Sequence, residues 1–256
     1  MKQPKSRWRF AMIWALRHAG VSLAVATLAA ILVYQFWYPM PYRAMLGIGS
    51  IFLILISVDV VCGPLLTLLL ANPQKSRREM ALDLTVVGAI QAAALVYGLH
   101  AVWSGRPVVL AFETDRIVVV SANEIESADL PSAPPGYQQL SFVGVLKVAT
   151  RKPKDNAEFF QSIDLSLAGF SPAMRPAWWQ PMNTQREQMR IVAKPLAELM
   201  ARRPEQADGL HIAAVNSGFS VDALSYLPLT SSKTKDWIAL LNDSMDMVGH
   251  APVDGF

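Results

Sequence analysis

One stretch of this chain constrains its fold more than any other. It is a 28-residue apolar run, Ala44–Ala71, whose single acidic residue is Asp59. About 20 apolar residues are enough to cross the hydrocarbon core of a bilayer, so the run is predicted to be a membrane span. A carboxylate at that depth costs roughly 2.5–3.5 kcal/mol on insertion scales, and such residues usually face protein and mark a function. Asp59 is therefore the first candidate site residue.

Two more apolar segments, Ala19–Tyr38 and Leu84–Trp103, are each long enough to cross a membrane. Basic residues precede the first, as in a signal peptide. Its apolar stretch is too long for one, however, and it lacks the small residues of a cleavage site, so we interpret it as an uncleaved anchor. The sequence thus predicts a membrane domain over residues 1–103 and a second domain over 104–256. Three transmembrane helices are expected in the first, at about 19–38, 44–71 and 84–103.

The distribution of charge predicts the topology. Through Trp103 the chain carries nine basic and three acidic residues, and the remainder carries 14 basic and 17 acidic residues. Lys and Arg concentrate in the N-terminal tail and between the second and third spans, which indicates a cytoplasmic N-terminus. Three crossings then place the C-terminal domain in the periplasm, for a multi-pass protein of a bacterial inner membrane. No basic patch interleaved with aromatic residues occurs in that domain, so a nucleic-acid partner is not expected.

The second span carries small and polar residues on one face. Spacings of three, four and eight residues align Asp59, Cys62, Gly63 and Thr67. Pro64 has no N–H, so the carbonyl of Val60 is expected to lose its helical partner and the helix to bend there. Small and polar residues suit contact between helices, because backbones approach closely and hydrogen bonds form. These four residues and Pro64 are the predicted contact site for a partner helix.

Three interpretations of Asp59 stay open at this point. Asp59 is protonated and hydrogen-bonded within the bundle to Tyr97, Gln91 or Thr67, and only holds the helices together. Alternatively, Asp59 receives a polar or cationic group from a partner helix. A proton or ion path is the third interpretation. Gln91 and Tyr97 are the predicted hydrogen-bonding residues of the bundle.

The sequence after Ser104 contains strand patterns. Runs rich in Val and Ile predict a hairpin over 107–121 that turns at residues 113–115. A further strand is predicted within 137–149, and three runs between 223 and 253 predict a meander.

Helical spacing of apolar residues predicts two helices in the same domain. One covers 155–167, with Asp155 as its N-cap, and the other covers 184–203, with a kink at Pro195. The predicted fold class is α+β: a three-helix transmembrane N-terminal segment, then a periplasmic domain with an antiparallel sheet and two or more helices.

Motifs of catalysis are missing from the sequence. The four histidines are far apart, none has HExxH spacing, and no GxSxG or Walker loop occurs. Cys62 is the sole cysteine, which excludes an intramolecular disulfide. We therefore predict no catalytic residue, no metal and no cofactor. Trp178 and Trp179 suit either sugar binding or the packing of a proline-rich corner.

Several segments resemble one family, the TfpX/TfpZ type IV pilin accessory proteins of Gram-negative bacteria. In the membrane part the matching segments are FWYP, VDVVCGPLLTLLL and DLTVVGAIQAAALVYG. Beyond it they are GRPVVLAFETDRIVVVSANEI, RPAWWQPM, SYLPL and DWIALLN…VDGF. The resemblance covers nearly the whole chain in order. One departure is SSKTKDW, where a more basic turn is expected.

The resemblance implies an inner-membrane chaperone or assembly modulator for a type IV pilin, without catalytic activity. Expected partners are the pilin subunit, other inner-membrane components of pilus assembly and the lipid bilayer, and the expected phenotype includes twitching motility. The pilin would contact the face around Asp59 through its apolar helix. The periplasmic domain would recognise the pilin head through Asp115, Arg116, Trp178 and Trp179.

The alternative is an enzyme. A membrane-anchored, pilin-modifying transferase acting in the periplasm would place Asp115, Trp178 and Trp179 in a cleft. No donor-binding motif supports this alternative.

Overall fold

The computed structural model describes residues 5–256, and the chain forms two compact units. The first unit comprises the described residues up to Pro39 together with Gly47–Ser104, and the second comprises Met40–Leu46 together with Gly105–Phe256. The chain therefore enters the second unit twice, once between the first two spans and once after the third. A single boundary near residue 103 therefore assigns Met40–Leu46 to the membrane domain, whereas this segment belongs to the second unit.

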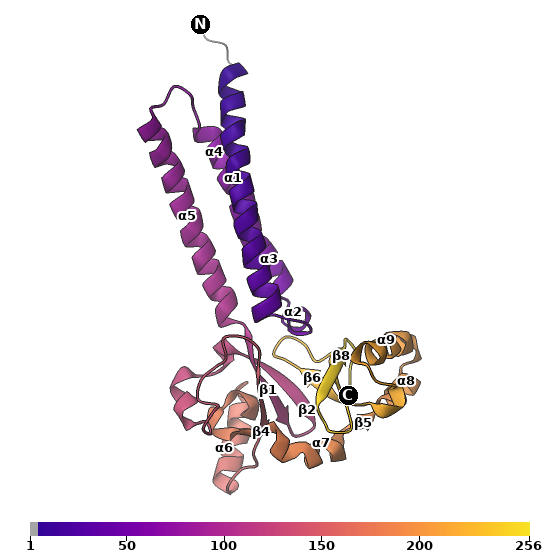
Figure 1. The fold of residues 1–256 in the computed structure, drawn as a ribbon. Helices are drawn as coiled ribbons and strands as arrows, with labels where there is room; N and C mark the ends of the chain where they lie inside the picture. The colour runs from indigo at the N-terminus through magenta and orange to yellow at the C-terminus, as the bar shows by residue number, and fades with distance from the viewer. Residues whose placement is uncertain (1–4) are drawn as a thin grey trace. The chain divides into compact units, whose positions relative to one another are not determined.

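The first unit contains three helices that are long and apolar enough to cross a membrane, as predicted. Figure 1 shows the first of them alongside the second. The first span consists of α1 (Lys5–Ile31) and the π-helical η1 (Leu32–Trp37). The second consists of α3 (Ile48–Ser57), the π-helical η2 (Val58–Cys62) and α4 (Gly63–Leu70), and the third is α5 (Arg77–Ser104).

Two of these helices begin earlier than their apolar segments. The helix α1 continues through the basic residues that precede Ala19. The helix α5 begins at Arg77 rather than at Leu84, because a capping box precedes it. The Ser76 N–H donates to Glu79 Oε2 over 2.7 Å, and the Glu79 N–H donates to Ser76 Oγ over 3.2 Å.

The second span departs from α-helical geometry where the sequence predicts a bend. The π-helical turn η2 ends at Cys62, directly before Gly63 and Pro64. A π turn inside an α-helix accommodates one extra residue, and such turns occur frequently at functional sites. The missing N–H of Pro64 is thus absorbed by a wider turn, and the span stays helical throughout.

The second span begins later than predicted. Residues 42–45 form the separate short helix α2 (Tyr42–Met45), which belongs to the second unit. Gly47 follows with a left-handed φ of 65°, a conformation that glycine adopts without a Cβ penalty, and α3 starts at Ile48. The predicted start at Ala44 is therefore corrected. Tyr42 and Met45 are buried in the core of the sheet of the second unit.

The second unit is built on one mixed sheet (Figure 1). Its strands are β1 (Pro107–Glu113), β2 (Arg116–Ser121), β3 (Leu146–Thr150), β4 (Trp179–Pro181), β5 (Lys194–Pro195), β6 (Ser225–Thr230), β7 (Trp237–Leu241) and β8 (Met247–Ala251). The order is β4-β3-β1-β2-β6-β7-β8, and β5 pairs with β6. The α+β class, the hairpin β1–β2 and the meander β6–β7–β8 are confirmed. The pairs β1–β3 and β2–β6 are parallel, where an antiparallel sheet was predicted.

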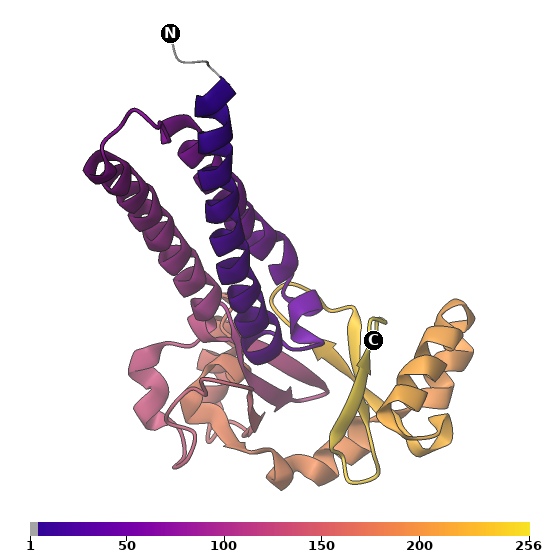
Figure 2. The same cartoon turned by 45° about the horizontal axis from the view of Figure 1, so that its top comes forward.

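Helices and short 3-10 turns connect and cover the strands. The α-helices are α6 (Asn156–Leu167), α7 (Arg186–Val192), α8 (Leu196–Arg202) and α9 (Ala207–Ser217). The 3-10 turns are η3 (Ala122–Glu124), η4 (Ser127–Ser132), η5 (Pro172–Met174), η6 (Pro176–Trp178), η7 (Met182–Gln185), η8 (Pro204–Gln206) and η9 (Val221–Ala223). The helix α9 lies beside β8 in both views (Figures 1 and 2).

The single helix predicted over 184–203 is wrong. Residues 186–192 form α7, Lys194–Pro195 forms β5 and pairs with β6, and α8 follows. Proline has no N–H and pushes the residue before it towards extended backbone, so Pro195 ends the first helix rather than kinking a longer one. Lys194, the residue before Pro195, lies in strand β5, and Ala193, where α7 ends, already has an extended ψ of 142°.

The core of the second unit lies on both faces of the sheet. Residues of β1 alternate between two apolar clusters, with Leu110 and Phe112 in one and Val109 and Ala111 in the other. Strands buried on both faces read as continuous apolar runs, which explains the Val- and Ile-rich pattern of the hairpin. The sheet is thus a rigid base for the loops and helices at its ends.

Candidate functional site

A half-open cavity of about 180 Å³ lies among the three membrane helices of the first unit. It is lined by residues of α1, of the middle of the second span and of α5, and most of them are apolar. Asp59 lines it and is only 7% exposed. Neither carboxylate oxygen has a hydrogen-bond partner among the residues that the structure describes. The interior of the bundle therefore holds a carboxyl group without a hydrogen bond of ordinary geometry, with Gln91 as a polar neighbour.

The π-helical turn determines which residues accompany Asp59. Asp59, Gly63 and Thr67 are buried, whereas Cys62 is exposed. The wider π turn brings residues four apart onto one face and rotates the residue three positions on away from it. Of the predicted contact face, Asp59, Gly63 and Thr67 thus lie together, half-buried Pro64 lies beside them, and Cys62 points elsewhere.

Gln91 lies next to Asp59 because Gly63 has no side chain. A Cβ at Gly63 would lie 2.3 Å from Gln91 Nε2, so the glycine is needed for this close approach. Gln91 Nε2 donates to the backbone carbonyl of Asp59 over 2.8 Å. The amide of Gln91 thus bonds within the bundle, as predicted: it donates to the backbone carbonyl of Asp59, and the Gln91 side chain also lies near the Asp59 carboxyl group.

Tyr97 is not part of this site. Its side chain is 78% exposed on α5, and its predicted hydrogen bond to Asp59 is wrong. Six residues separate it from Gln91, which places the two side chains about 120° apart around a helix of 3.6 residues per turn. Tyr97 and Asp59 are predicted to lie at similar depths along their helices, which favours a contact between them. Tyr97 points to another side of α5, however, so the contact does not form.

Two polar residues of α1 also line the cavity, and no prediction from the sequence includes them. His18 and Ser22 lie four residues apart on one face of α1 and both border the cavity. His18 Nδ1 lies 2.5 Å from Thr67 Oγ1, which joins α1 to α4. Their four-residue spacing could have indicated a shared helical face. The predicted first span begins at Ala19, however, so His18 falls just outside it.

The chemistry of this cavity suits a ligand that is a cation or a hydrogen-bond donor, because an ionised carboxyl group only accepts hydrogen bonds. A carboxylate in hydrocarbon needs a proton or a positively charged partner, because its desolvation is otherwise uncompensated. The apolar lining around Asp59 suits an apolar partner that presents a single polar group. A group of three or more His, Cys, Asp or Glu side chains able to hold a metal does not occur in the described part of the chain.

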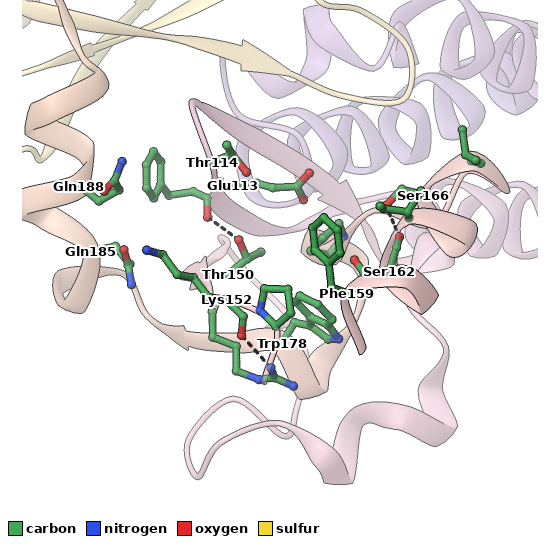
Figure 3. A pocket seen from close by; sticks show the side chains of 16 residues that line it. Glu113, Thr114, Thr150, Lys152, Phe159, Ser162, Ser166, Trp178, Gln185 and Gln188 are labelled. Carbon is green, nitrogen blue, oxygen red and sulfur yellow. Dashed lines mark hydrogen bonds between the residues drawn. The ribbon is translucent and has the colours of Figure 1, made fainter. Parts of the chain in front are cut away.

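A larger hollow, about 520 Å³, lies in the second unit, and we call it the α6 groove. It is located where the parallel strands β1 and β3 end: Glu113 is the last residue of β1 and Thr114 follows it, and Arg151–Pro153 follow β3. Ligands of open sheets commonly bind at the carboxyl ends of parallel strands. Figure 3 shows Gln185, Gln188 and Lys152 on one side of the groove and Phe159, Ser162 and Ser166 on the other.

The helix α6 is held to the domain by its polar face. Arg175 Nη2 donates to Ser162 Oγ over 3.1 Å, and Ser162 is buried. Arg151 forms a bidentate ion pair with Glu158, with nitrogen–oxygen distances of 2.6 and 2.9 Å. That guanidinium, followed by the Lys154 N–H, lowers the pKa of Glu158 to about 2. The guanidinium carbons of both arginines lie within 5 Å of the Trp178 ring centroid, at 4.8 and 4.9 Å.

The apolar face of α6 consequently points away from the core. Five large apolar side chains on α6 or just after it are more than 40% exposed: Phe159, Phe160, Ile163, Leu167 and Phe170. Of these, Phe159, Ile163 and Leu167 line the α6 groove. Helical spacing predicts this helix correctly, but the side that packs on the domain is the polar one.

The other residues predicted for recognition are dispersed. Trp178 is 7% exposed and lines the α6 groove. Trp179 is buried in a core cluster, where its Nε1 donates to the Ala173 carbonyl over 2.9 Å. Asp115 and Arg116 form an exposed ion pair of 2.9 Å at the β1–β2 turn. The structure therefore brings Trp178 to the groove and not Trp179, and a cleft holding Asp115 with both tryptophans does not form.

The fold and these two sites define a protein with three helices long and apolar enough to cross a membrane and a mixed-sheet domain, with a candidate site in each unit. The model of the family "Fimbrial assembly protein FimB" matches residues 6–47. The chain is 33% identical over 253 residues to "Fimbrial assembly protein, serogroup I" of Dichelobacter nodosus, with 98% of each chain covered. It is 32% identical over 253 residues to the serogroup E1 protein of that organism, again with 98% of each covered.

A third relative, "Fimbrial assembly protein, serogroups C1 and C2" of Dichelobacter nodosus, is 40% identical over 129 residues, which are 50% of this chain and 98% of that protein. No solved structure matches the chain. The likeness over the full length shows that the chain belongs to the fimbrial assembly protein family. This membership confirms a fimbrial assembly protein, and the narrower TfpX/TfpZ assignment stays a prediction.

Proposed function

We propose that this protein is a non-catalytic factor of type IV pilus assembly, of the TfpX/TfpZ kind, which holds the membrane helix of the pilin subunit at Asp59. One observation carries the proposal. Asp59 is almost fully buried at a cavity among three membrane helices, and both its carboxylate oxygens lack a hydrogen-bond partner in the described chain. A polar or cationic group on the pilin helix would supply the missing partner.

A carboxylate within a membrane span is energetically costly, and this cost favours binding of a partner. A carboxylate within a span costs roughly 2.5–3.5 kcal/mol on insertion scales, so a partner that satisfies it is bound the more strongly. Gly88 and Ser22 line the cavity and keep its walls small, and small residues allow another helix to approach closely. The cavity thus provides both a charge and the space to reach it.

The course of the chain supports the expected topology. Residues 40–46 follow the first span and residues 105–256 follow the third, and both belong to one compact unit. Parts of one extramembrane unit lie on one side of the membrane. The loop between the second and third spans, with Lys75, Arg77 and Arg78, then lies on the other side, where the excess of positive charge is expected. We therefore place the second unit in the periplasm and the N-terminus in the cytoplasm.

The decisive experiment is site-specific photocrosslinking in cells. A benzophenone amino acid at Ile56, which lines the cavity, should crosslink to the pilin. The same probe at Leu53, which is 66% exposed on the same span, is the matched control and should crosslink to it weakly. Asp59→Asn keeps the size of the side chain and removes the charge. Loss of one charge-assisted hydrogen bond, worth about 1.5–3 kcal/mol, should reduce the crosslink from Ile56 by more than about tenfold.

Two results would overturn the proposal. Asp59→Asn and Gly63→Leu variants that crosslink and display surface pili at native levels would place the dock elsewhere. A pilin whose mass differs between cells with and without this protein would favour the modifying enzyme instead, since an assembly factor leaves the subunit mass unchanged.

A further inference from the structure

The α6 groove has the properties of a binding site whose partner is not part of this chain. Phe160 and Leu167 are 63% and 83% exposed, although neighbouring apolar residues of the sheet are fully buried. Contiguous exposed apolar surface on a soluble domain marks a site of interaction. The orientation of α6 is fixed by its own bonds, because Arg175 binds Ser162 and Arg151 binds Glu158 from the polar side. These bonds hold the polar side of α6 against the domain, so its apolar side stays exposed to solvent.

The groove itself is amphipathic. The helix α6 contributes Phe159, Ile163 and Leu167 to the lining. Figure 3 shows the side chains of Gln185 and Gln188 across the groove from Phe159. Three charged residues line it. Glu113 Oε2 accepts a hydrogen bond from the Ala173 N–H over 2.8 Å, and Arg151 is paired with Glu158. The ammonium of Lys152 has no hydrogen bond or ion pair within the described residues. Glu113 keeps its negative charge and acts on the nearby Arg175, so Lys152 is the cation of the groove that has no partner within the described residues.

We propose that the α6 groove binds a segment of the pilin head that combines apolar side chains with a carboxylate, so that the apolar side chains pack on α6 and the carboxylate pairs with Lys152. This inference rests on the proposed function for the identity of the partner. It adds the surface of the periplasmic domain that recognises the subunit, and the chemistry of the segment that is recognised.

Charge argues against a lipid surface as the occupant. The helix α6 contains Glu158 and Asp164 and neither Lys nor Arg. Helices that lie on membranes carry Lys and Arg beside their apolar face, because the surface of the bilayer is anionic. The composition of the groove, with aromatic residues next to charged side chains and amides, is instead that of a protein interface.

The test measures binding of the pilin head, produced without its membrane helix, to the full-length protein in detergent. Ile163→Ser and Lys152→Glu should each weaken binding by roughly tenfold or more, as truncation of a central interface residue does. Both positions are exposed, so folding is unaffected. The matched controls are Ile212→Ser on α9, which is 59% exposed, and Lys235→Glu, and neither should change the affinity.

A charge reversal identifies the carboxylate. Acidic residues of the head are changed to lysine one at a time, and one of these changes should restore binding to the Lys152→Glu variant. Binding that is native in both groove variants overturns the proposal. So does a change of Ile163→Ser from dimer to monomer with unchanged head binding, because a second copy would then occupy the groove.

This measurement is independent of the membrane dock. The head lacks the membrane helix, so Asp59→Asn should leave head binding unchanged. Loss of the Ile56 crosslink with intact head binding, or the reverse, therefore separates failure of this inference from failure of the proposed function.

Discussion

His18 and Thr67 lie 49 positions apart in the sequence and join the first membrane helix to the second, with 2.5 Å between His18 Nδ1 and Thr67 Oγ1. Thr67 is fully buried, and it lies two helical turns from Asp59 on the same face. The contact fixes α1 against α4, and α1 supplies one wall of the cavity that Asp59 lines. The hydrogen bond between these two residues therefore sets the width of the site.

Replacing Thr67 by valine should loosen this wall. The change keeps the shape of the side chain and leaves His18 Nδ1 without its partner. Polar contacts between membrane helices contribute roughly 0.5–2 kcal/mol, so the bundle should be less stable by about that amount. Unfolding in detergent mixtures measures the difference. Thr85→Val, at an exposed position of α5, is the control and should have no effect; equal losses in both would show that the contact is unimportant.

A methyl group at Gly63 should separate Asp59 from Gln91. In Gly63→Ala, the new Cβ would lie 2.3 Å from Gln91 Nε2, so the amide must move and lose its bond to the Asp59 carbonyl. We expect a loss of stability and fewer surface pili. Gly20→Ala is the control, because a Cβ there meets no atom within 4 Å and alanine favours a helix. A Gly63→Ala protein as stable as the Gly20→Ala protein would contradict this packing.

Truncating Met45 should destabilise the sheet domain rather than the membrane helices. Met45 is 2% exposed in the core cluster that also contains Leu110 and Ile117. Removing such a side chain to alanine costs about 2–5 kcal/mol. Hydrogen exchange at β1 and β2 should therefore accelerate, while exchange in α5 stays unchanged. Met40→Ala, 46% exposed in the same segment, serves for comparison and should leave both regions as they are.

Acid should release α6 from the domain. Arg151 lowers the pKa of Glu158 to about 2, below the ordinary value of 4.5. A depressed carboxyl pKa contributes stability that is present above pH 4.5 and is lost as the pH falls towards 2. Hydrogen exchange of α6, corrected for the intrinsic rate, should rise over that window. Glu158→Gln should remove the pH dependence, and a wild-type profile in this variant would assign the transition to another group.

The parts of the fold that the sequence predicts are those governed by local pattern. The hairpin follows from Val- and Ile-rich runs around residues 113–115, and the meander follows from three short apolar runs. Three spans follow from length and hydropathy alone. The parallel pairing of β1 with β3 does not follow, because it joins residues whose proximity depends on the whole chain.

The candidate site is predictable only in part, for geometric reasons. Asp59 is identified because inserting a carboxylate into a membrane costs free energy. Gly63 and Thr67 are identified because their spacing from Asp59 places them on the same helix face. The predictions for Cys62 and Tyr97 are wrong because the position of a side chain around the helix axis decides which side chains meet, and a π turn changes that position. The exposed face of α6 cannot be predicted from its spacing, since an amphipathic pattern does not say which face the domain will bind. That choice depends on Arg151 and Arg175, which lie outside the helix.

The place of Tyr42 and Met45 in the sheet core has a consequence for biogenesis. These side chains are synthesised before the second crossing, whereas the strands that they pack against are synthesised after the third. Residues from Gly105 onwards cannot complete this core without them. On the proposed topology, a polypeptide whose first two spans fail to insert would lack Tyr42 and Met45 on the side where the sheet folds, so an insertion error would become a misfolded domain that proteases can remove.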